Sequence, residues 1–296
     1  MRNKSSKKHG VNSLLNKSQS AMEYLMTYGW AILIIAIVLV ALFSLGIFNS
    51  ANFAPRAQPG SCEVLRNSAQ TSLVGQCNGM LPEYVAQFNG ATGSIEVANS
   101  QSLSPTSSIT ITVWVKLSGA VSNWASLNTK THGSDRSWWF GFTPGSSNTI
   151  LWSVNGDNYC ALPTSPLDSW QFIAVTYNST SGKLFYENSA LISSCSYSQT
   201  GSIPNTVSPI YLVGDPYWDV LNGTVANEQV YNATLSTKDI QALYQEGIGG
   251  APINVNNLVG WWPLNGNTND YSGNDNNGVP TNITYTSAWT SGYSAP

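Results

Sequence analysis

A long apolar segment near the N-terminus limits what this chain can fold into. From Ala31 to Phe48 the sequence is apolar except for Ser44 and Gly46. At ~1.5 Å per residue, a helix over this segment covers about 27 Å, enough to cross a thin hydrocarbon layer. All 15 acidic residues follow a leader that holds five of the 12 basic ones: Arg2, Lys4, Lys7, Lys8 and Lys17. Because basic residues hold their side of a span in the cytoplasm, the remainder of the chain is expected outside the cell.

Glu23 lies near the start of this helix, where a carboxylate needs a partner or water. A secretory signal peptide would end in a small-x-small cleavage site, which the stretch NSANFAPRAQ after Phe48 lacks. Lys17-Ser18-Gln19 followed by Glu23 resembles the class III signal of archaeal type IV pilin-like proteins. The resemblance implies that a prepilin peptidase cuts between Ser18 and Gln19 and leaves the helix in place. The chain departs from the family at Ser18, where glycine is usual.

After such a cut, Glu23 would lie one helical turn from the new α-amine of Gln19. In a bundle of identical or related pilin subunits, the pair would neutralise two charges that could not be buried singly. The alternative is that Glu23 lies at headgroup depth, where an acid at a helix N-terminus is tolerated.

The remainder of the chain has the composition of an extracellular β protein. Only 9% of residues are charged, and the chain holds 11 Trp, 14 Tyr and 25 Gly. Past Lys17, 7 basic residues stand against 15 acidic ones, so nucleic acid is not expected as a partner. We expect a basic leader over 1–18, a helix over 19–48, a linker with a disulfide loop over 49–82 and a β-sandwich over 83–296.

Cysteines and sequons agree with an outside location. Pairing of sequence neighbours would join Cys62 to Cys77 and Cys160 to Cys195, while two other pairings remain open. Four Asn-x-Thr acceptors for glycosylation follow the apolar segment: Asn178, Asn222, Asn232 and Asn282.

Alternating apolar residues predict strands beyond the linker. SITITVWVKL places Ile109, Ile111, Val113 and Val115 on one face. In SWWFGFTPG, Trp138 and Trp139 must face opposite ways. WQFIAVTYNSTSGKLFYEN predicts a hairpin with its loop at 178–182.

The stretch LSTKDIQALYQEGIGG predicts the one soluble helix. Ser236 is its expected N-cap, Asp239 completes a capping pattern, and Gly247 is the expected stop. The predicted fold is mainly β: an apolar N-terminal helix and an extracellular antiparallel sandwich with one short helix.

Four segments between Tyr84 and Tyr244 resemble the laminin-G-like, concanavalin A-like jelly-roll family: FNGATGSIEV, SITITVWVK, SWQFIAVTYNSTSGKLFYEN and LNGTVANEQVYNATLSTKDIQALY. The resemblance implies a two-sheet sandwich that usually binds glycans or proteins and only sometimes hydrolyses sugars. The later stretch LVGWWPL is too apolar to be left exposed. We expect it to add a strand to the same sandwich and to bury at least one of Trp261 and Trp262.

The sequence gives little support for catalysis. Only His9 and His132 are present, and no Glu-x-Asp-x-x-Glu pattern or zinc-ligand spacing occurs. The loop NDYSGNDNNG carries Asn269, and its Asp270, Asn274 and Asp275 are candidate calcium ligands. The competing interpretation is an Asx-rich turn whose side chains satisfy one another. No other cofactor is expected.

These observations predict a pilin-like adhesin at the cell surface that displays a lectin-like sandwich to a glycan or protein ligand. One alternative is a single-span anchored lectin that does not polymerise. Another, from a different class, is an extracellular glycosidase.

Overall fold

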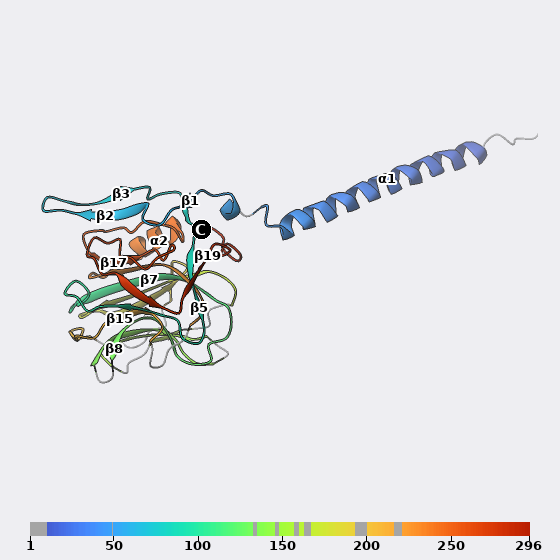
Figure 1. Cartoon of the computed structure of the whole chain (residues 1–296). Helices are drawn as coiled ribbons and strands as arrows, with labels where there is room; N and C mark the ends of the chain where they lie inside the picture. Colours follow the sequence, from blue (N-terminus) through green and yellow to red (C-terminus); the bar gives the residue numbers. More distant parts are fainter. Residues whose placement is uncertain are drawn as a thin grey trace, which may run out of the picture. The chain divides into compact units, whose positions relative to one another are not determined.

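The computed structural model describes residues 11–48, 50–132, 135–145, 148–156, 160–162, 167–192, 200–215 and 221–296 (Figure 1). The chain forms two compact units, Met1–Asn52 and Phe53–Pro296. The first contains the helix α1 (Val11–Ser44) and the 3-10 turn η1 (Ser50–Asn52), and the second contains all the strands and α2 (Thr237–Glu246).

α1 is apolar over much of its length. Its segment Met26–Ser44 is long and apolar enough to cross a membrane, with a mean hydropathy of 2.5. Most side chains of this segment are exposed in the isolated chain. An apolar surface of this extent needs hydrocarbon or other helices around it in order to be stable.

At its C-terminal end, α1 stops before the expected residue 48 because of a glycine. Gly46 has a φ of +67°, and its N–H donates to the carbonyl of Phe43 while Ile47 N–H donates to Leu42. These two bonds form a Schellman motif, which ends a helix at a left-handed residue. Residues 45–48 therefore form a turn, while the N-terminal end of α1 extends back to Val11.

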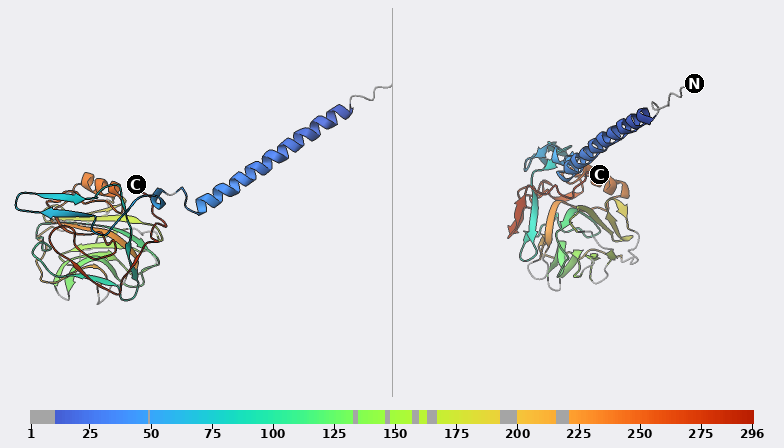
Figure 2. Two further views of the ribbon diagram at one scale, coloured as in Figure 1. Left: turned by 45° about the horizontal axis from the view of Figure 1, so that its top comes forward. Right: turned by 90° about the vertical axis from the view of Figure 1, so that its right-hand side faces the viewer.

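The second unit is a sandwich of two antiparallel sheets (Figures 1 and 2). One sheet has the order β14–β13–β12–β7–β16–β5–β19, with β17 also paired to β16, and the other has the order β11–β10–β9–β8–β15–β6–β18. The strands of the eight-stranded sheet are β5 (Val85–Asn89), β7 (Ser108–Leu117), β12 (Gln171–Asn178), β13 (Gly182–Glu187), β14 (Ala190–Leu191), β16 (Asn222–Tyr231), β17 (Leu258–Trp262) and β19 (Thr284–Thr286). Those of the seven-stranded sheet are β6 (Ser94–Val97), β8 (Ala125–His132), β9 (Asp135–Phe142), β10 (Ile150–Val154), β11 (Cys160–Leu162), β15 (Ile210–Val213) and β18 (Gly278–Thr281).

The core lies between the two sheets. It is formed by alternate residues of each strand, as the alternating apolar pattern of the sequence predicts. Ile109, Ile111, Val113 and Val115 of β7 all join it, opposite Trp138 and other residues of β8–β10. The hairpin β12–β13 and the capping box of α2 at Ser236, with its stop at Gly247, also form as predicted. The mainly β fold with one apolar and one short helix is confirmed.

The tail stretch joins the sandwich, as expected. β16 pairs with β7 along one edge, while its other edge pairs first with β5 and then with β17. Trp261 and Trp262 are both buried. A bulge in β16 accompanies this change of partner: Asn227 has a φ of +49°, and the register with β7 shifts there.

A third layer covers the outer face of the eight-stranded sheet. Trp114 projects outward from β7 and stacks on Tyr244 of α2, with ring centroids 5.8 Å apart. Tyr293 and Trp289 from the C-terminal stretch continue this aromatic cluster. In Figure 1, α2 lies on the side of β7 opposite to β8 and β15. The outer face of the seven-stranded sheet is also covered at several positions, since Ser126, Thr129, Ser137, Ser153 and Tyr211 are buried.

The expected linker over 49–82 is largely part of the folded unit. β1 (Arg56–Ala57) pairs in parallel with β4 (Leu81–Pro82), and β2 (Cys62–Arg66) forms a hairpin with β3 (Thr71–Gly75). Arg66 fastens this hairpin, because its guanidinium donates to carbonyls of Ser272, Val255 and Leu258. The absence of a regular hydrophobic pattern predicted a linker here. Long-range hydrogen bonds from side chains such as Arg66 instead hold the segment in one conformation.

Candidate functional site

Two tryptophans differ from the others in the folded unit. In the described part of Phe53–Pro296, seven tryptophans are buried: Trp114, Trp138, Trp152, Trp170, Trp261, Trp262 and Trp289. Trp124 and Trp139 are only half-buried, and they contact each other edge to face, with centroids 5.4 Å apart and planes at 84°. Partly exposed aromatic rings that converge are a feature of ligand sites, because such rings give a site both apolar area and shape.

Strand alternation explains why this pair faces outward. Trp138 and Phe140 of β9 point into the core, so Trp139 between them points away from it. Trp124 comes immediately before β8, which pairs with β9. The next outward position of β9 after Trp139 is Gly141, where a Cβ would clash with the carbonyl oxygen of Ala125 in β8. The opposite facing of Trp138 and Trp139 was predicted from sequence; the contact with Trp124 was not.

A row of residues continues across the same outer face. The ladders place Ser153 of β10 and Thr129 of β8 on either side of Trp139, followed by Tyr211 of β15 and Glu96 of β6. Glu96 is exposed, while Thr129 is fully buried. Ser153 and Tyr211 are buried as well, and the hydroxyls of Thr129 and Ser153 donate to the carbonyls of Trp138 and Gly156. The groups of this row that a ligand can meet are therefore the two half-buried indole rings and the exposed carboxylate of Glu96.

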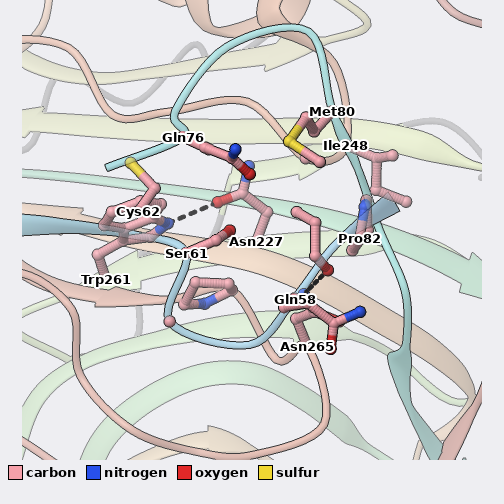
Figure 3. A pocket seen from close by; sticks show the side chains of 14 residues that line it. Gln58, Ser61, Cys62, Gln76, Met80, Pro82, Asn227, Ile248, Trp261 and Asn265 are labelled. Atoms are coloured by element: carbon pink, nitrogen blue, oxygen red, sulfur yellow. Dashed lines mark hydrogen bonds between the residues drawn. The ribbon is translucent and has the colours of Figure 1, made fainter. Parts of the chain in front are cut away.

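A small cavity lies elsewhere, between the N-terminal stretch and β16–β17 (Figure 3). Its volume is about 40 Å³, and its lining includes Gln58, Gln76, Met80 and Asn265. The side-chain amide of Asn265 hydrogen-bonds to the backbone of Ala57 and Tyr84. That of Asn227 hydrogen-bonds to the carbonyl of Gly250 and to the indole N–H of Trp261. These bonds stabilise the wall of the cavity. A space of this size holds a few water molecules and no sugar ring. We therefore place the candidate ligand site at the Trp124–Trp139 face.

The loop expected to bind calcium is instead organised by internal bonds. Asp270 Oδ1 accepts from the N–H groups of Trp261 and Ser272, and Oδ2 accepts from Asn276 N–H and the Ser272 hydroxyl. Burial raises the pKa of Asp270, and these four donors offset part of that rise. Asn274 donates to Val259, and Asp275 is exposed.

These four bonds occupy the acceptor positions of Asp270, which favours the Asx-rich turn, and the calcium set stays a prediction. Among the described residues, no group of three or more His, Cys, Asp or Glu side chains could hold a metal.

The remaining predicted residues fall in several places. Cys62 and Cys77 form a disulfide. Cys160 lies in β11, and Cys195 lies outside the described residues. Ser18, Gln19 and Glu23 lie within α1. Asn222, Asn232 and Asn282 are exposed, and Asn178 is half-buried.

Among the buried ionisable side chains that the sequence did not indicate, Glu228 and Lys130 face the core between the two sheets. Glu228 is fully buried; burial raises its pKa well above the ordinary value, and a hydrogen bond from Asn128 offsets part of this rise. Burial lowers the pKa of Lys130 to about 8, and its ammonium donates to Asn99, Leu103 and Ser104. Both lie inside the sandwich and not on its outer face, so neither is placed to meet a ligand there.

Comparison with known proteins agrees with this architecture. Residues 89–241 match the model of the concanavalin A-like lectin/glucanases superfamily. No curated protein sequence matches the chain. A putative carbohydrate binding protein from Bacteroides ovatus has a similar structure, with a TM-score of 0.54, 12% identity, and coverage of 85% of this chain and 84% of that one. A heptameric SAP-like pentraxin from Limulus polyphemus has a TM-score of 0.50 at 12% identity, over 68% of this chain and 94% of that one. At this identity the two likenesses establish the fold alone.

Proposed function

The chain belongs to the concanavalin A-like lectin/glucanases superfamily, and on that premise we propose that it is a membrane-anchored surface protein that binds glycans. The observation that carries this proposal is the half-buried Trp124–Trp139 pair on the outer side of the seven-stranded sheet. Sugar rings have apolar C–H faces that pack on aromatic rings. The role is binding and not catalysis, because Glu96 is the one carboxylate of the described row, whereas glycoside hydrolysis generally uses two.

The charge of the folded unit narrows the ligand class. From Phe53 onward, seven Lys and Arg stand against fourteen Asp and Glu, a formal net charge of −7. Two of the seven cations, Lys130 and Lys183, are buried and add little to the surface field. An acidic surface repels acidic polymers, so neutral glycans are the favoured ligands.

The test is glycan binding by the full chain in lipid nanodiscs, measured on an array of neutral and acidic oligosaccharides. Trp139→Ala and Trp124→Ala should each weaken binding roughly ten-fold, as expected for the loss of one aromatic contact. Phe53→Ala is the matched control, because it removes a 71% exposed aromatic ring that lies outside this face. Equal binding by Trp139→Ala and the unmodified chain, with unchanged melting, would contradict the proposal, as would the absence of any bound glycan.

The anchor is proposed to be pilin-like. The basic leader, Ser18-Gln19 and Glu23 support processing by a prepilin peptidase and assembly of the helices in a membrane or filament. Mass spectrometry of the mature N-terminus decides between this and the single-span anchored lectin: a chain that starts at Gln19 supports the first, and an intact Met1 supports the second. Glu23→Gln should leave membrane insertion unchanged and impair filament formation. Normal filaments from this variant would contradict the charge pairing.

A further inference from the structure

The four sequons, which look equivalent in sequence, differ sharply in the folded chain. Asn178 ends β12 and is engaged through both ends of its amide. Its Nδ2 donates to Ser108 Oγ at 3.3 Å and to Thr234 Oγ1 at 3.4 Å. Its Oδ1 accepts from the N–H and hydroxyl of Thr180, at 2.9 and 2.6 Å. A sugar on Nδ2 would replace a proton used in these bonds and would displace the neighbouring side chains.

Asn222 and Asn232 are exposed, but the threonines that complete their sequons are not available. Thr224 is 6% exposed, with its hydroxyl buried inside the sheet. Thr234 donates its hydroxyl proton to the carbonyl of Tyr177 while accepting from Asn178. Asn222 begins β16 and Asn232 directly follows it. The Asn282 sequon also reaches a paired strand, because Thr284 begins β19 and pairs with Gln87, so the difference lies in the exposure of the threonine side chain.

Asn282 differs from these three. It lies in the turn between β18 and β19, with a φ of +50°, and both Asn282 and Thr284 are exposed. β18 pairs with the seven-stranded sheet and β19 with the eight-stranded one, so the turn crosses the rim of the sandwich. Exposed turns are the segments that a modifying enzyme can draw out of a folded protein.

We propose that Asn282 is the acceptor of an Asn-linked glycan on the folded chain. The co-reactant is a polyprenyl-diphosphate-linked sugar. Asn282 Nδ2 forms a bond to the anomeric carbon, the bond from that carbon to the diphosphate oxygen breaks, and the amide proton leaves to a base on the transferring enzyme. No oxidation or reduction takes place. The inference is independent of the proposed glycan binding, since the acceptor and the Trp124–Trp139 face are different surfaces.

The test compares each sequon in a peptide with the same sequon in the fold. The full chain is produced without glycans in a host that lacks Asn-linked glycosylation, and is held in nanodiscs. It is then treated with a single-subunit oligosaccharyltransferase and a lipid-linked donor. Four synthetic peptides that span Asn178, Asn222, Asn232 and Asn282 report the rate set by sequence alone. Glycopeptide mass spectrometry reads the occupied sites.

We expect all four peptides to be modified and the folded chain to gain one glycan, at Asn282. Asn282→Gln should abolish the gain, while Asn222→Gln, at an exposed asparagine whose sequon has a buried threonine, should leave it unchanged. Chain unfolded in urea and diluted into the assay should gain further glycans. Modification of the folded chain at any other site as fast as at Asn282 would overturn the proposal, as would an unmodified Asn282 whose peptide is modified.

Discussion

Glu228 Oε1 accepts a hydrogen bond of 2.6 Å from Asn128 Nδ2, which joins β16 of one sheet to β8 of the other through the core. Asn128 Oδ1 in turn accepts from Trp138 Nε1 at 2.7 Å. Glu228 Oε2 is buried without a hydrogen-bond partner among the described residues. An ionised carboxylate in this position would be costly, so burial keeps the folded chain in the protonated form.

This buried carboxyl predicts a pH dependence of stability. Its folded pKa is raised, so above about pH 4.3 the unfolded chain releases a proton that the folded chain keeps. The free energy of unfolding then falls by about 1.4 kcal/mol per pH unit until the folded pKa is reached. Glu228→Gln keeps the acceptor oxygen and has no proton to release. The melting temperature of Glu228→Gln should be higher than that of the unmodified chain at pH 7. Below about pH 4 the two melting temperatures should be equal. A gap that is constant from pH 4 to 8 would show that Glu228 does not titrate in this way.

We expect Asp270 to stabilise the fold and not to bind calcium. Asp270→Ala removes the acceptor of four hydrogen bonds and should lower the free energy of unfolding by about 3 kcal/mol or more, judged from thermal melts. Asp275→Asn, at an exposed position of the same loop where the φ of +58° is tolerated by Asp and Asn, should change it by less than ~0.5 kcal/mol. Calcium in the millimolar range should not raise the melting temperature of the unmodified chain. A calcium-dependent rise that is lost in Asp270→Ala would restore the ligand interpretation.

Arg66 fastens the N-terminal hairpin to the C-terminal loops. Arg66→Ala leaves three carbonyl groups without their donor and should cost about 2–3 kcal/mol in urea unfolding. Arg66→Lys should recover little, because one ammonium cannot reproduce the planar fork of donors. Lys238→Ala removes a cation from an exposed position of α2 and is the control. If Arg66→Ala unfolds at the same urea concentration as the control, the hairpin is held by other contacts.

Local patterns in the sequence account for much of this fold. Alternation placed Ile109 and Ile111 on one face, capping residues placed α2, and the apolar LVGWW predicted the strand β17. Each of these signals lies within a few neighbouring residues, where the backbone geometry fixes which way a side chain points. The disulfide between Cys62 and Cys77 was predicted in a similar way, by pairing cysteines that are close in sequence, here 15 positions apart.

The remaining features depend on contacts between distant segments. Arg66 meets Ser272, 206 positions further along, and no local pattern indicates that meeting. The sequence around Asn227 does not indicate a bulge, because it resembles that of a regular strand. Asparagine only permits the bulge, since it tolerates a positive φ better than most residues. Trp124 was not singled out because its value as a site residue comes only from its contact with Trp139.

The Cys62–Cys77 bond also has a mechanical consequence. A pull on the chain from its N-terminal side enters the folded unit at Phe53 and passes along β1, whose parallel bonds to β4 are then loaded in shear. If the hairpin were torn from the C-terminal loops, an uncrosslinked chain could extend by about 50 Å across the residues between these cysteines. The covalent bond bypasses that segment, so tension goes directly from Cys62 to Cys77 and on to the sandwich. The segment between Phe53 and the sandwich therefore resists extension while the disulfide is intact. Once the disulfide is reduced, this segment would lengthen under tension.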